Sequence, residues 1–157
     1  MEKVPMTQQG LETLDEEFHR LRDKERHAVI KAIAEAREHG DLSENAEYHA
    51  ARERQSFIEG RLAELEDVIS RADVIDPSKI SGKVVRFGAT VVVADEDNDE
   101  ELTYQIVGTY EADIDSGLLS VTSPMARAMI GKTIGDSIEV NTPRGPKGYE
   151  ICGVKFK

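Results

Sequence analysis

Apolar and small residues in the first half of the chain recur at alternating intervals of three and four. One series comprises Leu11, Leu14, Phe18, Leu21, Glu25, Ala28, Ala32 and Glu35. A second series, with the same alternation, comprises Tyr48, Ala51, Gln55, Ile58, Leu62, Leu65, Ile69 and Ala72. A period near 3.5 residues is typical of helices that pack as a coiled coil. The pattern therefore predicts two long helices that bury these positions against each other.

The two series are mirror images of each other about a point between Asp41 and Leu42. Leu11 lies as far before this point as Ala72 lies after it, and the inner members pair in the same way. Such pairs can meet only if the chain folds back on itself. We therefore expect an antiparallel helical hairpin with its turn at this point.

Local residues around the turn agree with this prediction. Gly40 can adopt the left-handed conformation that commonly ends a helix, so we expect the first helix to end near His39. Either Asp41 or Ser43 could serve as the N-cap of the second helix, because both side chains accept hydrogen bonds from free amides. A first helix of this extent is about 45–50 Å long.

The composition of the two series changes along the hairpin. Leu, Phe and Ile fill the positions far from the turn, whereas Ala, Gln and Glu fill those near it. Small residues let two helices approach closely but bury less apolar area. The pattern predicts a hairpin that is slender toward its charged turn, a shape suited to a narrow opening.

The periodicity changes near residues 76–78 from helical to short β-like runs, which predicts two domains, 1–76 and 77–157. Strands are expected at 82–94, either as one strand bent at Gly88 or as two short ones, and at 102–107, 118–121, 136–141 and 148–156. A capping Ser, a Pro at the first helical position and a following Gly predict a short helix over 123–131. The expected fold class is α+β, a coiled-coil hairpin followed by a small antiparallel sheet with one short helix.

Charge and composition restrict the function classes. The net charge of −11 argues against autonomous binding to nucleic acid, which requires a basic face. No apolar run approaches the roughly 20 residues of a membrane span, and the start of the chain lacks a signal-peptide core. We therefore expect a cytoplasmic protein without membrane contact. The single cysteine, Cys152, has no internal disulfide partner, and we expect it to be buried in the sheet.

Asp41 and Glu44 are the candidate chemical groups at the turn. Taken alone, this spacing is also that of a capping box, in which the first acid caps the helix and the second reaches back. The four histidines and Cys152 show no zinc-binding spacing. The acidic run 95–101 lacks the ordered spacing of a calcium loop and is expected to be a solvated hairpin turn.

Three separated stretches resemble a known family: IAEAREHGDL at 33–42, ENAEYHAARE at 44–53 and SPMAR at 123–127. These motifs, in this order, are similar to those of the bacterial Gre family of transcript cleavage factors, and the resemblance covers essentially the entire chain. It implies an N-terminal coiled coil and a C-terminal domain with an FKBP-like fold.

The resemblance also implies a function. Such a factor binds RNA polymerase, inserts its coiled coil into the secondary channel and stimulates the polymerase's own hydrolysis of backtracked RNA. It would not be an enzyme by itself, and we expect a monomer that contacts the nascent RNA 3′ segment inside the complex. Asp41 and Glu44 match the family's acids at the turn and would complete a Mg²⁺ site shared with the polymerase, with no cofactor held stably by the chain alone.

The resemblance assigns two further groups of residues. Arg37 and Arg52 would form a basic patch that faces the RNA, although ordinary pairing along the helices is the alternative. Ser123, Pro124 and Met125 match the loop that docks on the polymerase. An N-capped helix start is the alternative there, and both can hold together.

Other functions remain open at this point. A Gre-like inhibitor that blocks the channel would share the architecture but carry a different, more acidic turn. A prolyl isomerase would use the FKBP-like fold, yet it needs an aromatic-lined pocket, and the second domain has few aromatic residues and no Trp. A purely structural coiled coil is a further alternative.

Overall fold

The computed structural model describes residues 2–40 and 45–156. The chain divides into two compact units. The first contains Leu11–Ala72, and the second contains Lys3–Gly10 together with Asp73–Lys157. Each unit is considered by itself.

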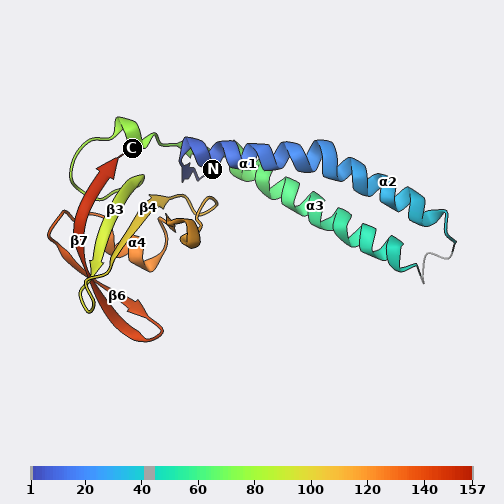
Figure 1. The fold of residues 1–157 in the computed structure, drawn as a ribbon. Coiled ribbons are helices and arrows are strands. Elements are labelled where there is room, and N and C mark those ends of the chain that lie inside the picture. Colours follow the sequence, from blue (N-terminus) through green and yellow to red (C-terminus); the bar gives the residue numbers. More distant parts are fainter. Residues whose placement is uncertain (1, 41–44, 157) are drawn as a thin grey trace. The chain divides into compact units, whose positions relative to one another are not determined.

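The first unit is built from two helical arms that lie side by side (Figure 1). One arm is continuous and consists of α1 (Gln8–Arg20), the π-helical turn η1 (Leu21–Glu25) and α2 (Arg26–Arg37). The other arm is α3 (Ala46–Ser70). The side chains buried along the arms include Leu14, Leu21, Ile58, Leu62, Leu65 and Val68. The predicted helical hairpin is therefore confirmed, and all of these residues except Val68 belong to the two apolar series.

The buried face of the first arm changes at η1. A π-helical turn contains one residue more than an α-helical turn, so every later side chain is rotated around the helix. Val29 and Ala36 are buried, with exposed fractions of 5% and 2%. The predicted positions Ala28, Ala32 and Glu35 are exposed instead. The prediction for this segment was wrong by one residue, because a regular helix was assumed throughout.

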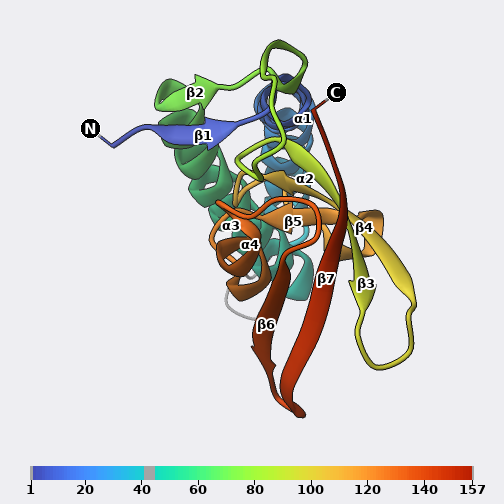
Figure 2. The ribbon, with the colours of Figure 1, turned by 90° about the vertical axis from the view of Figure 1, so that its left-hand side faces the viewer.

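The second unit is organised around a five-stranded sheet with the order β5-β4-β3-β7-β6 (Figure 2). The strands are β3 (Ala89–Asp95), β4 (Glu101–Val107), β5 (Leu118–Ser120), β6 (Ser137–Thr142) and β7 (Gly145–Phe156). All neighbouring pairs are antiparallel except β4 and β5, which run parallel. The predicted all-antiparallel sheet was wrong at this edge, because the chain crosses over through the 3-10 turn η3 (Ile114–Ser116) before β5.

The helix α4 (Pro124–Met129) packs on this sheet through Ala126 and Met129, both of which are fully buried. Valines of β3 together with Ile106, Ile138 and Ile151 complete the core. The strands β1 (Val4–Met6) and β2 (Ala72–Val74) form a separate two-stranded sheet. The 3-10 turn η2 (Pro77–Lys79) follows β2. The α+β fold class is confirmed, whereas the predicted strand over 82–94 begins only at Ala89.

Two side chains of the sheet differ from expectation. Cys152 is exposed, because it alternates along β7 with the buried Tyr149 and Ile151 and so points to the opposite face. Asp95, at the start of the predicted acidic turn, is only 3% exposed. Its Oδ2 forms an ion pair with the Lys147 Nζ at 2.7 Å. The hydrogen bond from Lys147 lowers the pKa of Asp95, so this acid belongs to the fold and not to the solvated turn.

Within residues 2–40 and 45–156, no helix is both long and apolar enough to cross a bilayer.

Candidate functional site

The turn between α2 and α3 is framed on both sides by described residues. Gly40 has a φ of 108°, a left-handed conformation that favours glycine and ends the first arm. Asn45 is the N-cap of α3, and its Oδ1 accepts a 3.0 Å hydrogen bond from the Tyr48 amide. Its Nδ2 donates a 2.7 Å hydrogen bond to the carbonyl of Ala36. One side chain therefore caps the second arm and ties it to the end of the first.

This arrangement corrects the N-cap prediction. The cap is Asn45, later in the chain than either predicted candidate. The predicted acids Asp41 and Glu44 lie outside the described residues, so their roles stay predictions. Two carboxylates suit a Mg²⁺ ion that is shared with another protein, because Mg²⁺ keeps several of its ligands from water or substrate. Among the described residues, no group of three or more His, Cys, Asp or Glu side chains is placed to hold a metal by itself.

The predicted basic residues lie on the two arms near the turn. Arg37 is the last residue of α2, and Arg52 lies in the second turn of α3. Both side chains are exposed, and neither forms an ion pair or hydrogen bond with another described residue. The alternative pairing of Arg52 with Ser56 or Asn45 is therefore not seen, whereas the alternative pairing of Arg37 with Asp41 lies outside the described residues. Both guanidinium groups are open to an external anion as far as the described part of the chain is concerned.

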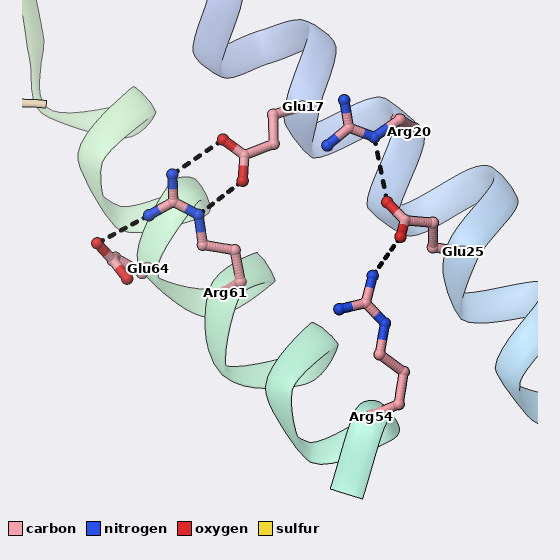
Figure 3. Close-up of polar contacts among 6 residues, drawn as sticks. All are labelled: Glu17, Arg20, Glu25, Arg54, Arg61 and Glu64. Carbon is pink, nitrogen blue, oxygen red and sulfur yellow. Dashed lines mark hydrogen bonds and ion pairs between the residues drawn. The ribbon is translucent and has the colours of Figure 1, made fainter. Parts of the chain in front are cut away.

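Ion pairs join the two arms in the middle of the hairpin (Figure 3). Arg61 of α3 holds Glu17 of α1 in a two-point contact of 2.7 and 2.9 Å. Glu25 of η1 accepts hydrogen bonds from Arg20 at 3.1 Å and from Arg54 across the hairpin. A third pair, between Arg26 and Glu59, has contacts of 2.7 and 2.6 Å. We call the three pairs that cross the hairpin, Glu17–Arg61, Glu25–Arg54 and Arg26–Glu59, the cross-helix staples.

The staples shift the ionisation of their members in the expected directions. The hydrogen bond from Arg61 lowers the pKa of Glu17, and the hydrogen bond from Arg20 is the main cause of the lowered pKa of Glu25. Side-chain exposures of 25% for Glu17 and 27% for Arg61 make this pair the least exposed of the three. Periodicity alone placed Glu25 in the apolar series. The presence of Arg54 on the opposite helix was the sequence feature that could have predicted an ion pair for Glu25.

A shallow groove lies between α2 and α3 on the side of the staples nearer the turn. It encloses about 480 Å³ and is lined by Glu25, Ala28, Val29, Ala32, Glu47, Ala50, Ala51 and Arg54. Alanines dominate its walls, as the sequence predicted for this half of the hairpin. Less apolar contact is therefore available here than among the leucines, and the staples and the Asn45 bond add to the contacts of the buried Val29 and Ala36.

The predicted docking residues form the start of α4. The Ser123 hydroxyl accepts a 3.2 Å hydrogen bond from the Ala126 amide and donates a 2.7 Å bond to the Ser120 carbonyl. Pro124 is the first residue of the helix and is exposed, whereas Met125 is half-buried against the core. The helix-cap reading is therefore confirmed. It leaves Pro124 and one side of Met125 accessible, so a docking role is compatible with it.

A basic and apolar surface next to α4 was missed by the sequence analysis. Val85 exchanges backbone hydrogen bonds with Gly131 and Lys132, at 2.9 and 2.8 Å, so the segment before β3 runs beside the segment after α4. Exposed side chains on these two segments are Lys83, Val84, Arg86, Ile130, Lys132 and Ile134, and the exposed Arg127 of α4 adds to this surface. None of its four cations has an ion pair with a described residue. The sequence feature that could have predicted this surface is the absence of Asp and Glu from 77–94 and 116–135, in a chain whose net charge is −11.

Comparisons with known proteins cover both units. A family profile described as "Transcription elongation factor, N-terminal" matches residues 4–74, and one described as "Transcription elongation factor, GreA/GreB, C-term" matches residues 80–156. The transcription elongation factor GreA of Caulobacter vibrioides is 65% identical over 156 residues, which is 99% of each chain. That of Paracoccus denitrificans is 64% identical with the same coverage. Among solved structures, GreA factor homolog 1 of Thermus thermophilus is 30% identical, covers 97% of this chain and 98% of its own, and has a TM-score of 0.44.

Proposed function

Because the chain belongs to the GreA/GreB family of transcription elongation factors, we propose that it binds RNA polymerase and stimulates the polymerase's hydrolysis of backtracked RNA. The hairpin would enter the secondary channel with its turn foremost. The chain would act as a single copy in the cytoplasm and would not be an enzyme by itself. The observation that carries this proposal is a helical hairpin whose framed turn has Asp41 and Glu44 in its sequence.

The two acids would act on the reacting phosphate through the polymerase. Asp41 and Glu44 would offer carboxylate oxygens to a Mg²⁺ ion that the polymerase active centre holds only weakly. When bound, that ion helps to activate the attacking water and to stabilise the leaving oxygen. This chain would bring the two carboxylates to the polymerase active centre and hold them there.

Arg37 and Arg52 would bind the displaced RNA. Both are exposed near the turn and have no partner among the described residues. A phosphate in a channel would therefore meet guanidinium groups that have no ion pair with a described residue to break first. This contact would hold the extruded RNA 3′ segment beside the acids.

The decisive experiment measures cleavage in halted elongation complexes with end-labelled RNA at several Mg²⁺ concentrations. We expect Asp41→Asn with Glu44→Gln to lower the stimulated rate by at least about 10²-fold, since removal of even an indirect metal contact costs 10–100-fold. Glu38→Gln, a change at an exposed acid on the same turn, is the matched control and should retain activity.

The outcomes of this experiment separate the alternatives. Cleavage by the double variant at the normal rate would refute the role of the acids. Slower nucleotide addition without any stimulated cleavage by the unaltered protein would instead favour a channel-blocking inhibitor.

The C-terminal unit would dock on the polymerase through Ser123, Pro124, Met125 and the neighbouring basic and apolar surface. Three large apolar side chains, Val84, Ile130 and Ile134, have exposed fractions of 41%, 38% and 53% and lie among the four cations. A phosphate backbone offers little apolar surface, and the acidic chain repels nucleic acid. An acidic protein surface with apolar residues fits both properties.

A charge reversal tests this docking surface. Arg86→Glu with Lys132→Glu should weaken equilibrium binding to RNA polymerase by about tenfold or more, because like charges would then face each other. Arg144→Glu with Lys155→Glu makes the same change of net charge at exposed sites elsewhere in the unit. Equal weakening by both pairs would show a general charge effect and would contradict the assignment of this surface.

A further inference from the structure

The carboxylate of Glu111 is held against the start of the first helical arm. Its Oε2 accepts hydrogen bonds from the backbone amides of Thr7, at 2.8 Å, and Gly108, at 3.1 Å. Its Oε1 accepts a short hydrogen bond from the Thr7 hydroxyl. Thr7 is a buried polar residue, 7% exposed. One side chain thus satisfies three donors from two segments separated by more than 90 positions in the chain.

The same contacts continue into α1. The Thr7 hydroxyl accepts a 3.0 Å hydrogen bond from the Gly10 amide, which is one of the free donors in the first turn of a helix. Glu111 therefore orients the hydroxyl that caps α1, and its negative charge lies at the helix end where it is favourable. All of these residues belong to the second unit, and α1 continues from there into the hairpin.

Two glycines leave the space that this contact needs. A Cβ atom on Gly10 would come within 2.5 Å of the Glu111 carboxyl carbon. A Cβ atom on Gly108 would lie 2.3 Å from the carbonyl oxygen of Pro5. Neither glycine has a left-handed φ, so backbone conformation does not explain them. Glycine inside a helix is unfavourable, and at Gly10 the compensating gain is room for the carboxylate.

We infer that Glu111 is a positioning residue for the stimulated cleavage. It anchors the first turn of the arm that carries the turn acids, so that binding energy gained by the C-terminal unit also holds the hairpin for reaction. This inference rests on the proposed function. Small displacements of a reacting group lower rates steeply, whereas neither Glu111 nor Thr7 belongs to the surface proposed to dock on the polymerase.

Two variants break the anchor in opposite ways. Glu111→Ala removes the carboxylate. Gly10→Ala keeps it but forces it out of place, while giving α1 a better helix former. If the anchor matters, both changes should lower the maximal rate of stimulated cleavage by about tenfold at saturating factor, and the half-saturating concentration should change by less than about threefold. Asp115→Ala, at an exposed acid four positions away, is the matched control.

A second pair of variants provides rescue. Thr7→Val removes the hydroxyl at constant shape and should reproduce the defect, whereas Thr7→Ser keeps the hydroxyl and should restore activity. Hydrogen exchange of the free protein gives a readout that does not depend on the polymerase. The amides of residues 7–11 should exchange at least about tenfold faster in Glu111→Ala and Gly10→Ala, with the core strands β3 and β7 unchanged.

The failures of the two proposals are distinguishable. Unchanged exchange at residues 7–11, or normal maximal cleavage despite faster exchange, would overturn the role of Glu111 and leave the proposed function standing. Absence of stimulated cleavage by the unaltered protein would overturn the proposed function and, with it, this role.

Discussion

The staple between Glu17 and Arg61 should contribute measurably to hairpin stability, unlike most ion pairs at protein surfaces. Its two hydrogen bonds of 2.7 and 2.9 Å join α1 to α3, and both side chains are about three-quarters covered. The perturbation is a double-mutant cycle built from Glu17→Gln and Arg61→Met. Glutamine keeps the size of the acid, and methionine keeps the apolar stem of the arginine.

The magnitude follows from the environment of the pair. Two unit charges about 4 Å apart attract by about 4 kcal/mol at an effective dielectric constant near 20. Desolvation and the ordering of two long side chains cancel most of this energy, and fully exposed pairs retain about 0.2–1 kcal/mol. Partial burial and two-point geometry place this pair above that range. We therefore expect a coupling free energy of about 1–2 kcal/mol.

The coupling should also depend on pH in one direction. The pKa of Glu17 is lowered from its ordinary value of 4.5 by Arg61, so the unfolded chain takes up a proton before the folded one. The stabilisation is therefore fully present above the ordinary value and is lost as the pH falls through the lowered pKa. Arginine stays charged throughout, so no loss is expected at neutral or mildly alkaline pH.

Chemical denaturation followed by far-UV circular dichroism measures the cycle. Arg22 and Asp23 provide the control cycle, because they are neighbours on one arm with exposures of 43% and 56% and should couple more weakly than Glu17 and Arg61. A coupling for Glu17 and Arg61 no larger than that of the control would refute the reasoning. So would a coupling that stays constant down to about pH 3, since the cause would then not be the carboxylate charge.

Two further predictions concern the hairpin. Asn45→Ala should destabilise the start of α3 by about 1 kcal/mol, measured as faster hydrogen exchange of its first amides. Asn45→Asp should keep the cap and lose only the hydrogen bond to Ala36, so its effect should be smaller. Equal effects of the two variants would contradict the double role of Asn45. Deletion of Lys24 should convert η1 to a regular helical turn and leave Val29 and Ala36 buried, so the free energy of unfolding should fall by less than about 1 kcal/mol in chemical denaturation. Deletion of Lys31, which lies beyond η1, should lower the free energy of unfolding by more. The reverse order would contradict the inferred change of register at η1.

The architecture could be predicted from the sequence because a long apolar repeat leaves few alternatives. The series in α3 predicted Ile58, Leu62 and Leu65 as buried, and they are. The series in α2 failed because a π-helical turn carries no composition signal: Leu-Arg-Asp-Lys-Glu suits an ordinary helix equally well. The hydrophobic pattern of this segment does not show that η1 contains one residue more than an α-helical turn. The extra residue is seen only from which side chains of α2 pack against α3.

The sheet and the site show the same limit. The direction of β5 depends on how the preceding crossover runs, which a short apolar run does not encode. Asn45 was missed as the cap because Asp41 and Ser43 are equally good capping residues, and the additional bond to Ala36 favours Asn45. Glu111 left no sequence signal, since Thr7, which donates two of its three hydrogen bonds, lies at the other end of the chain. The acids Asp41 and Glu44 were found by position and resemblance, and they stay a prediction.

The cross-helix staples give the hairpin an unequal response to ionic strength. Far from the turn, leucine and isoleucine side chains hold the arms together, and added salt does not weaken such contacts. In the middle, Glu25–Arg54 and Arg26–Glu59 are exposed enough for counterions to compete with them. Concentrated salt would therefore loosen the half of the hairpin nearer the turn while the other half stays closed. The salt content of a cleavage assay is then a variable that acts on the factor itself as well as on its binding to the polymerase.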